Sequence, residues 1–467
     1  MSARYSKKPA GYDTPAPLTV THPHAAGIDI HLGIHWVAVP PQSAPPPPTG
    51  HPANLPPWVR SFGTCTADLE MLADWLKECG VTTVAMEATG IYWITTFELL
   101  ERRGFEVYLV EPRQSKRAPG RPKTDVLDCQ WLQRLHSYGL LTASFRPADQ
   151  VVVLRSYLRQ RQMLIGYGSQ HIQHMQKALE QMNVKLTLVV SDVTGVTGMA
   201  IIKAIVAGQR DPLLLAKLRN NKCQHTEEEI ARALYGNWRE EHLFALQQAL
   251  ELYLFYQRLL QTCDLALAKH LGTFADQSGG EELPPKPQKR KRGNNAPRFD
   301  VRQQLFQMAG VDLTVIEGID EATALVLLSE IGTDVSKFPS AKHFASWLGL
   351  CPQHQASAGK IKSRRVRKGQ NRAARALRLA AQGCHRSHNA MGAFYRRIQA
   401  RCGGPRAVVA TAHKIAARVY RLLKYGEVYV RKEMADYEDH YRKQLLKGLA
   451  RRAKEMGYRL EPAEATT

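Results

Sequence analysis

Four acidic residues have the types and spacing of a metal-dependent phosphoryl-transfer site. Asp29 lies inside an apolar run, where burying a charge is costly unless it meets a cation or a partner. Glu87 closes a later apolar run, and Asp125 and Asp128 are three residues apart at a helix start, so both lie on one face. Carboxylate oxygens are the ligands that Mg²⁺ prefers. The four acids therefore predict a magnesium site, with Mn²⁺ as a substitute.

Taken singly, each acid also has a structural explanation. Asp29 fits a strand end, Glu87 a surface position, and Asp125 the first turn of a helix, where a negative charge is favourable. The joint placement of these acids on two strands and one helix face favours the metal site over separate structural roles.

The elements that must position the acids form an alternating pattern of strands and helices, which indicates an α/β domain with mixed strand direction. Apolar runs and helical spacing predict strands at 26–30, 36–39, 59–64, 81–87 and 105–110, and helices at 68–79, 94–103 and 125–138. The strand at 36–39 is expected to lie antiparallel to the first. A proline-rich stretch at 40–57 predicts an extended excursion from the compact domain.

Residues 151–271 are predicted to be almost entirely helical. One apolar stripe, interrupted at Arg161 and Gly168, consists of Leu154, Leu158, Ile165, Ile172, Met175, Leu179 and Met182. A second stripe consists of Leu252, Tyr256, Leu259 and Cys263, and Thr226 with Glu229 forms a capping box. Paired helices of this length provide spacing or a dimer contact, or they form an ordinary intramolecular hairpin, and both alternatives stay open.

Charge is very unevenly distributed along the chain. The net charge is +22, and residues 335–426 contain twenty Lys and Arg but no Asp or Glu. A surface that only needs to be soluble mixes both signs, so this segment predicts a polyanionic partner. The sequence has neither an eighteen-residue apolar run nor a signal-peptide core near its start, so we expect a cytoplasmic protein with no membrane partner.

A serine in a loop of small residues lies within the basic segment. The loop 356–359 allows a close approach of backbone to nucleic acid. Its serine is Ser357, and Ser363 is a second candidate. The cations expected to bind nucleic acid are Lys360, Lys362, Arg364, Arg365, Arg367, Lys368, Arg372 and Arg375. Ser357 either attacks phosphorus as a nucleophile or only hydrogen-bonds a phosphate, and its chemistry alone leaves both roles open.

Residues 313–332 resemble a helix-hairpin-helix, in which a glycine-rich turn directs backbone N–H groups to a DNA phosphate. Asp320 occupies the place of the usual second glycine. An acid there repels phosphate, which favours an architectural role. A DNA contact stays open as the alternative for this unit.

Three motifs, Gly27-Ile-Asp-Ile-His, Met86-Glu-Ala-Thr-Gly and Lys123-Thr-Asp-Val-Leu-Asp-Cys, together with the serine loop, resemble the DEDD transposases of insertion sequences. The resemblance covers most of residues 25–425. It implies an α/β RNase H-like (RuvC-like) N-terminal domain, a long helical or coiled-coil middle region, and a mainly α C-terminal domain with a helix-hairpin-helix. A DEDD exonuclease is the nearest competitor, but those enzymes carry Asp-x-Glu on the first strand, and here His31 follows Asp29 at that spacing.

The same resemblance implies how the site works. Asp29, Glu87, Asp125 and Asp128 become the metal-binding acids, and Ser357 becomes the nucleophile of a recombinase acting on element ends and target DNA. It further implies assembly across subunits of a dimer or tetramer, a structured non-coding RNA of the bridge-recombinase type, and association with a bacterial nucleoid. The sequence resembles no major-groove recognition element, which fits a protein that delegates sequence choice to base pairing.

These inferences divide the chain into six parts. They are a disordered tail (1–24), the nuclease-type domain (25–148), a helical region (149–275), a basic linker (276–300), the basic transposase domain (301–440) and a C-terminal helix or tail (441–467). Two rival functions remain. A hydrolytic Holliday-junction resolvase needs the acids but not Ser357, and a nucleic-acid-binding protein without enzyme activity needs neither.

Overall fold

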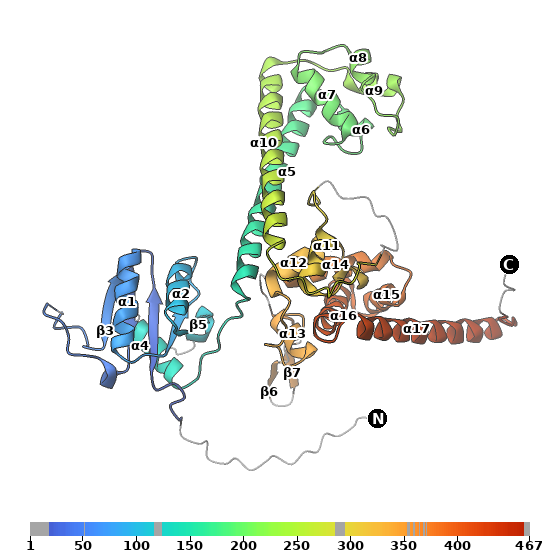
Figure 1. Cartoon of the computed structure of the whole chain (residues 1–467). Helices are drawn as coiled ribbons and strands as arrows, with labels where there is room; N and C mark the ends of the chain where they lie inside the picture. Colours follow the sequence, from blue (N-terminus) through green and yellow to red (C-terminus); the bar gives the residue numbers. More distant parts are fainter. Residues whose placement is uncertain are drawn as a thin grey trace. The chain divides into compact units, whose positions relative to one another are not determined.

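The computed structural model of the 467-residue chain describes residues 18–50, 52–115, 124–284, 295–352, 355–357, 360–363, 365–367, 369 and 371–461. The chain divides into two compact units, residues 1–146 and 147–467. Figure 1 shows the elements of both units along the chain.

The first unit is built on a five-stranded mixed sheet with the strand order β3-β2-β1-β4-β5. Strands β4 and β5 run parallel to β1, and β2 runs antiparallel to both of its neighbours. The strands are β1 (Ala25–Ile30), β2 (Ile34–Ala38), β3 (Val59–Gly63), β4 (Thr83–Glu87) and β5 (Glu106–Val110). The helices are α1 (Thr66–Glu78), α2 (Trp93–Arg102), α3 (Pro112–Ser115) and α4 (Asp125–Ser137), with the 3₁₀ turn η1 (Pro41–Ser43).

Helices cover both faces of this sheet. Because side chains alternate along a strand, Ile28 and Met86 face α1 and α2, where they join the main core with Leu72 and Leu76. The opposite face packs against α4, where Leu132 contacts residues of β4 and β5. Every predicted strand and helix of this domain is confirmed, and the mixed sheet is compatible with the RNase H-like domain that the resemblance implies.

The proline-rich excursion connects β2 to β3. The backbone N–H of Val39 donates to the carbonyl of Trp58 at 3.0 Å, so the chain leaves and re-enters the sheet at neighbouring points. Leu55 and Trp58 pack back against the cluster around Cys129 of α4. The excursion is therefore attached to the core at its base.

The second unit contains two long antiparallel helices, α5 (Asp149–Gln181) and α10 (Glu240–Leu271), with shorter helices at their tip (Figure 1). The shorter helices are α6 (Leu186–Val189), α7 (Val196–Val206), α8 (Pro212–Ala216) and α9 (Glu227–Leu234). The capping box that begins α9 is confirmed, since the side chains of Thr226 and Glu229 each accept from the other residue's backbone N–H. Within this chain the long helices form an intramolecular hairpin, which is the second of the two alternatives above.

The contact face of this hairpin differs from the predicted stripes. Arg161 and Gly168, which interrupt the first stripe, are both buried: Arg161 Nε donates to Asp264 Oδ1 at 2.6 Å, and Gly168 faces Tyr256. The second stripe is confirmed only in part: Tyr256 stacks on His171 of α5, whereas Leu252 is exposed and α10 also buries Leu260, Asp264 and Leu267. A polar residue was not expected in the contact face, but the ion pair with Arg161 allows Asp264 to be buried there.

The remaining helices form a basic helical body. They are α11 (Val301–Ala309), α12 (Glu321–Ile331), α13 (Ala341–Trp347), α14 (Arg372–Gly383), α15 (Ala390–Cys402), α16 (Gly404–Tyr425) and α17 (Glu427–Glu455), with the 3₁₀ turns η2 (Leu313–Val315) and η3 (Cys384–Arg386). A two-stranded ribbon joins α13 to α14 and consists of β6 (Gln355–Ser357) and β7 (Lys360–Ser363). Tyr420 of α16 is fully buried and donates its hydroxyl to the Phe338 carbonyl at 2.7 Å.

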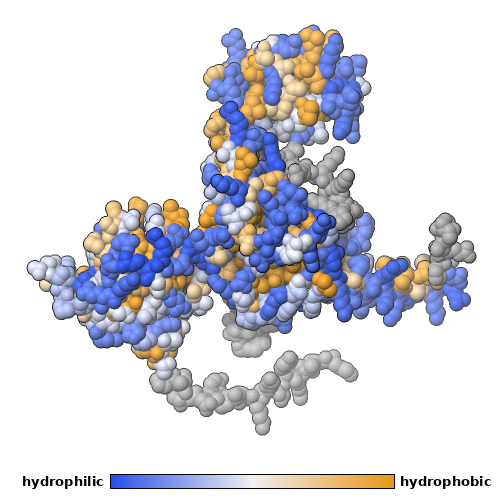
Figure 2. All heavy atoms as spheres, in the orientation of Figure 1, coloured by the Kyte–Doolittle hydropathy of each residue, from blue (hydrophilic) through white to orange (hydrophobic). Residues whose placement is uncertain are grey.

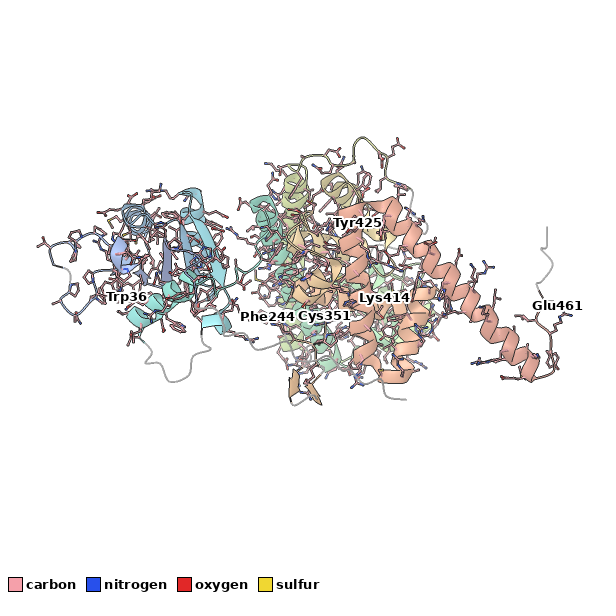
Figure 3. All side chains as sticks on the ribbon, turned by 90° about the horizontal axis from the view of Figure 1, so that it is seen from below. Trp36, Phe244, Cys351, Lys414, Tyr425 and Glu461 are labelled. Carbon is pink, nitrogen blue, oxygen red and sulfur yellow. The ribbon has the colours of Figure 1, made fainter. Side chains whose placement is uncertain are left out.

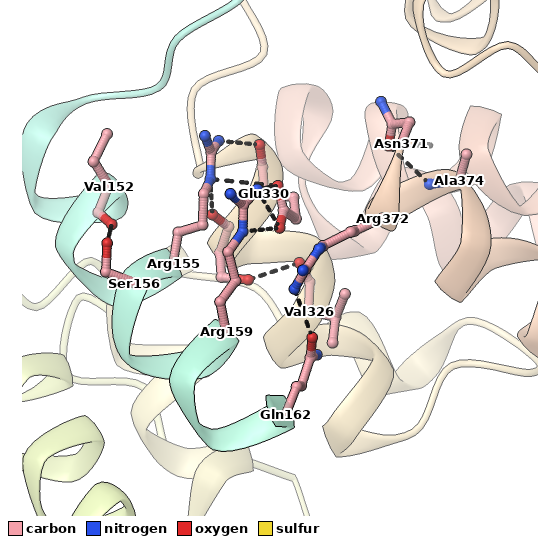
Figure 4. A network of polar contacts seen from close by, with 11 residues as sticks. Val152, Arg155, Ser156, Arg159, Gln162, Val326, Glu330, Asn371, Arg372 and Ala374 are labelled. Atoms are coloured by element: carbon pink, nitrogen blue, oxygen red, sulfur yellow. Dashed lines mark hydrogen bonds and ion pairs between the residues drawn. The ribbon is translucent and has the colours of Figure 1, made fainter. Parts of the chain in front are cut away.

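Ion pairs fix α12 against α5 within this unit. Arg159 Nη2 donates to both carboxylate oxygens of Glu330, at 2.9 and 3.0 Å. Arg155 donates to the backbone carbonyl of Glu330 at 2.8 Å (Figure 4). The ammonium group of Lys414 on α16 lies 3.9 Å from the ring centre of Tyr437 on α17, a cation–π contact; Figure 3 labels Lys414. The first part of α17 therefore packs on α16.

Exposed apolar side chains gather at the tip of the hairpin. Leu188, Val196, Leu213 and Leu214 are between 45% and 74% exposed, and Figure 2 shows apolar residues at this tip. None of the helices in the described part of the chain is long and apolar enough to cross a membrane.

Candidate metal and nucleic-acid site

The central strand places Asp29 on the sheet face that α4 covers. Asp29 pairs in register with Trp36 of β2, which Figure 3 labels, and its side chain is 13% exposed. Gly27 lies two residues earlier and therefore on the same face. Gly27 therefore faces α4, as Asp29 does.

The approach of α4 depends on the absence of a side chain at Gly27. A Cβ at that position would lie 2.2 Å from the backbone N of Gln133 and 2.5 Å from the carbonyl of Cys129. The side chain of Gln133 also donates to the Ala25 carbonyl at 3.3 Å. The backbones of β1 and α4 are thus in direct contact, and this contact brings the start of α4 to Asp29.

A local cap fixes the first turn of α4. The hydroxyl of Thr124 accepts from the backbone N–H of Leu127 at 3.3 Å, so the helix begins at Asp125. Asp125 and Asp128 both lie in this first turn, as predicted, where the helix dipole favours negative charge.

Three side chains converge at this point. His31 Nε2 lies 3.1 Å from Asp29 Oδ2 and 3.5 Å from Asp125 Oδ1. One ligand atom from each of the three residues lies within 4.8 Å of the others. Asp29 is the least exposed of the three, whereas the side chains of His31 and Asp125 are 42% and 52% exposed. The cluster is therefore open to solvent on one side.

Glu87 lies on the strand beside Asp29. The β1–β4 register pairs Ile28 with Met86, so the next residues, Asp29 and Glu87, are neighbours at the ends of parallel strands. The hydroxyl of Ser115 hydrogen-bonds to the Glu87 carboxylate, and the carbonyl of Ser115 accepts from Trp131 Nε1 at 2.9 Å. Helix α4 thus also supports the orientation of Glu87.

Negative charges lie close together in this cluster. Burial raises the pKa of Asp29 above its ordinary value, His31 partly offsets this, and the negative charges of Glu87 and Asp125 raise the pKa further. A divalent ion among these oxygens would remove the repulsion. The donor set of carboxylate oxygens and one imidazole nitrogen suits Mg²⁺ or Mn²⁺.

Two predicted ligands, Asp29 and Asp125, are therefore brought together, with Glu87 adjacent. Asp128 lies on the same helix turn but outside the three-residue group. Sequence reasoning missed His31 and Ser115. His31 carried a usable signal, because it lies two residues after Asp29 and so on the same side of an extended chain. Ser115 carried none, since it lies in a short helix outside the motifs.

Ser357 is the last residue of β6 and pairs with Lys360 of β7. Ala358, Gly359, Arg364 and Lys368 lie outside the described residues. The fallback candidate Ser363 accepts from the backbone N–H of Arg365 at 3.2 Å.

The predicted nucleic-acid-binding cations that the structure describes lie on the ribbon, just after it, and on α14. Lys360 and Lys362 belong to β7, and Arg365, Arg367, Arg372 and Arg375 are exposed. Arg372 also donates to Gln162 of α5 at 2.9 Å (Figure 4), so it has a partner within the unit.

The turn before α12 has a structural explanation. Asp320 caps the helix by accepting from the backbone N–H of Thr323 at 2.8 Å. Gly318 has φ +88°, and a Cβ there would lie 2.8 Å from the Ala380 carbonyl. The Asp320 carboxylate thus occupies the helix N-terminus and the turn packs on α14. A helix-hairpin-helix contact with DNA stays a prediction.

Comparisons with known proteins cover both units. Residues 26–184 match the transposase family DEDD_Tnp_IS110, and residues 311–396 match the transposase IS116/IS110/IS902 family. Over 119 residues the chain is 33% identical to the "Insertion element IS110 uncharacterized 43.6 kDa protein" of Streptomyces coelicolor. That similarity covers 25% of this chain and 29% of the relative.

Proposed function

The chain belongs to the IS110 family of DEDD transposases, and from this premise we propose that it cleaves and exchanges DNA strands for an insertion sequence. The observation that carries the proposal is the convergence of Asp29, His31 and Asp125, with Glu87 on the adjacent strand. A largely covered carboxylate close to other acids favours a bound cation, and phosphoryl transfer is a reaction for which such a cation is used.

The acids hold the metal in this proposal. Asp29 and Asp125 contribute carboxylate oxygens, and so does Glu87, which Ser115 orients. Asp128, three residues after Asp125 in the first turn of α4, is the fourth proposed ligand. When bound, Mg²⁺ polarises the scissile phosphate and offsets its developing charge. The open side of the cluster, at Asp125 and His31, is where a phosphate would enter.

Ser357 is the proposed nucleophile. Its oxygen attacks phosphorus, a new O–P bond forms, the bond to the leaving DNA oxygen breaks, and the serine proton passes to solvent or a carboxylate. Attack by a DNA hydroxyl on the phosphoserine reverses these bonds and joins the strands. Two features support this role for Ser357: the resemblance of its loop to that of the DEDD transposases, and the cations on β7 and directly after it. The letters DEDD in the family name refer to the acids and not to the serine.

The proposed partners are DNA, a structured non-coding RNA and further copies of the chain. The acid-free segment 335–426 supports a nucleic-acid partner, because neutralising phosphates releases counterions. The exposed apolar side chains at the hairpin tip support contact between copies in a dimer or tetramer, since such patches mark interaction sites. The RNA rests on the family resemblance.

A denaturing trapping assay tests the proposal. Protein, element-end DNA, co-expressed RNA and Mg²⁺ are incubated, and a covalent protein–DNA adduct is measured on a gel. We expect an adduct with the wild type and with Ser363→Ala, the matched control on the same ribbon, and near-total loss of adduct and recombination with Ser357→Ala. Asp29→Ala should abolish recombination as well.

Each component of the proposal has its own contrary result. Recombination at the wild-type rate by Ser357→Ala would refute the serine as the nucleophile. The same result with Asp29→Ala would refute that carboxylate as a metal ligand. Cleaved DNA without an adduct from both wild type and Ser357→Ala would support the hydrolytic resolvase. Unchanged recombination after RNase treatment, with no RNA added, would remove the guide RNA from the mechanism.

A further inference from the structure

We propose that His31 is itself a ligand of the cation, so that the site discriminates in favour of Mn²⁺ over Mg²⁺. The inference deepens the proposed function and rests on its metal requirement. The four-acid motif does not include this residue, and an all-carboxylate site would have no nitrogen donor.

The distances around His31 fit one ion rather than a chain of hydrogen bonds. Adjacent ligands of an octahedral ion are about 3 Å apart when metal–ligand distances are about 2.1 Å. The His31 Nε2 distances to Asp29 Oδ2 and Asp125 Oδ1, 3.1 and 3.5 Å, lie near that value. One donor atom from each of the three residues lies within 4.8 Å of the others, close enough for one ion to reach all three.

A hydrogen-bonding role alone leaves one of these contacts unexplained. Nε2 carries at most one proton, which can serve only one of the two carboxylates well. The contact with Asp29 meets hydrogen-bond distance, while the 3.5 Å contact with Asp125 is long for one. A cation between the three groups would instead satisfy the Nε2 lone pair and both carboxylates together.

The chemistry of the nitrogen determines which ion benefits. Mg²⁺ is a hard ion that favours oxygen ligands and gives up water reluctantly, whereas Mn²⁺ lies in the series of transition ions that accept imidazole more readily. An imidazole at this position therefore adds more to Mn²⁺ binding than to Mg²⁺ binding. The alternative role is a positive counter-charge for the acids, which a metal would displace.

The test measures metal binding and not activity. Mn²⁺ is titrated into the full-length protein, its affinity is measured by electron paramagnetic resonance, and coupling of the bound ion to ¹⁴N is measured by electron spin-echo modulation. Mg²⁺ affinity is measured by competition. His225→Gln is the matched control, because His225 also contacts a carboxylate, that of Glu229 at 3.0 Å, but lies in the other unit.

We expect ¹⁴N coupling in the wild type and in His225→Gln, and its loss in His31→Gln. His31→Ala should lower Mn²⁺ affinity about tenfold or more, the scale on which ligand-shell changes act, while lowering Mg²⁺ affinity far less. Bound Mn²⁺ that Asp29→Asn abolishes, but without ¹⁴N coupling, would overturn the role of His31 and leave the proposed function standing. Tighter metal binding by His31→Ala would overturn it in favour of the counter-charge. Absence of Mn²⁺ binding by the wild type would overturn both proposals.

Discussion

Replacing Gly27 with alanine should separate α4 from the central strand and open the metal site. The added Cβ would lie 2.2 and 2.5 Å from backbone atoms of α4, about 1 Å inside ordinary contact, and backbone cannot rotate away as a side chain would. Overpacking of this kind costs about 1–3 kcal/mol. Because Asp125 begins the same helix, its carboxylate would move away from Asp29 and His31, and a displacement of about 1 Å can cost about 100-fold in rate.

The assay combines urea unfolding of the full-length protein, Mn²⁺ affinity and the rate of strand cleavage. Gly33→Ala is the matched control, because nothing lies within 4 Å of a Cβ at Gly33 and its φ is not positive. Gly27→Ala should lose stability, metal affinity and cleavage together, while Gly33→Ala should retain all three. A Gly27→Ala protein that unfolds, binds Mn²⁺ and cleaves like the wild type would refute the close packing of α4 on β1.

Three further changes test other contacts. Ser115→Ala removes the hydroxyl that orients Glu87 and should slow strand cleavage about 10-fold or more at saturating Mg²⁺, measured by single-turnover gels; an unchanged rate would exclude the orienting role. Arg161→Ala leaves Asp264 buried without its partner and should cost about 3–5 kcal/mol in urea unfolding, whereas Arg161→Met with Asp264→Leu should recover much of that loss. Burial, with the charge of a neighbouring histidine, lowers the pKa of His136 to about 4, so protonation favours the unfolded state and stability should fall by about 3 kcal/mol as the pH drops from about 6.5 to 4. His136→Gln should flatten that dependence, and an equally steep fall in the variant would assign it to other groups.

Sequence reasoning located the strands and helices of the first unit because each has a strong local signal. Apolar runs and helical spacing are bounded there by glycine, proline and polar turns, and the observed ends lie within a few residues of the predicted ones. The acids are candidates for the same reason: a charged residue such as Asp29 inside an apolar strand conflicts with its local surroundings.

The contact face of α10 was predicted only in part, because it depends on another helix. Asp264 is polar, so periodicity places it outside the apolar stripe, yet it is buried in the contact because Arg161 faces it from α5. The same ion pair ties in the chain that follows, since Asp264 Oδ2 accepts from the backbone of Arg298 at 3.0 Å and Arg161 donates to the Asn295 carbonyl at 2.9 Å. A single-residue pattern contains no information about such partners, which are about one hundred positions apart.

The proposed metal site shows the same division between local and distant information. Asp29, Glu87 and Asp125 come from two strands and a helix, and each is marked in its own segment, but what brings them together is the backbone contact at Gly27 and the support of Glu87 by Ser115. Neither residue can bind a metal in the observed arrangement, since one has no side chain and the other donates to a ligand. A site of this kind therefore depends as much on residues that permit approach and fix orientation as on the acids themselves. Substitutions at Gly27 and Ser115 should accordingly reduce metal binding or cleavage although neither removes a proposed metal-binding side chain.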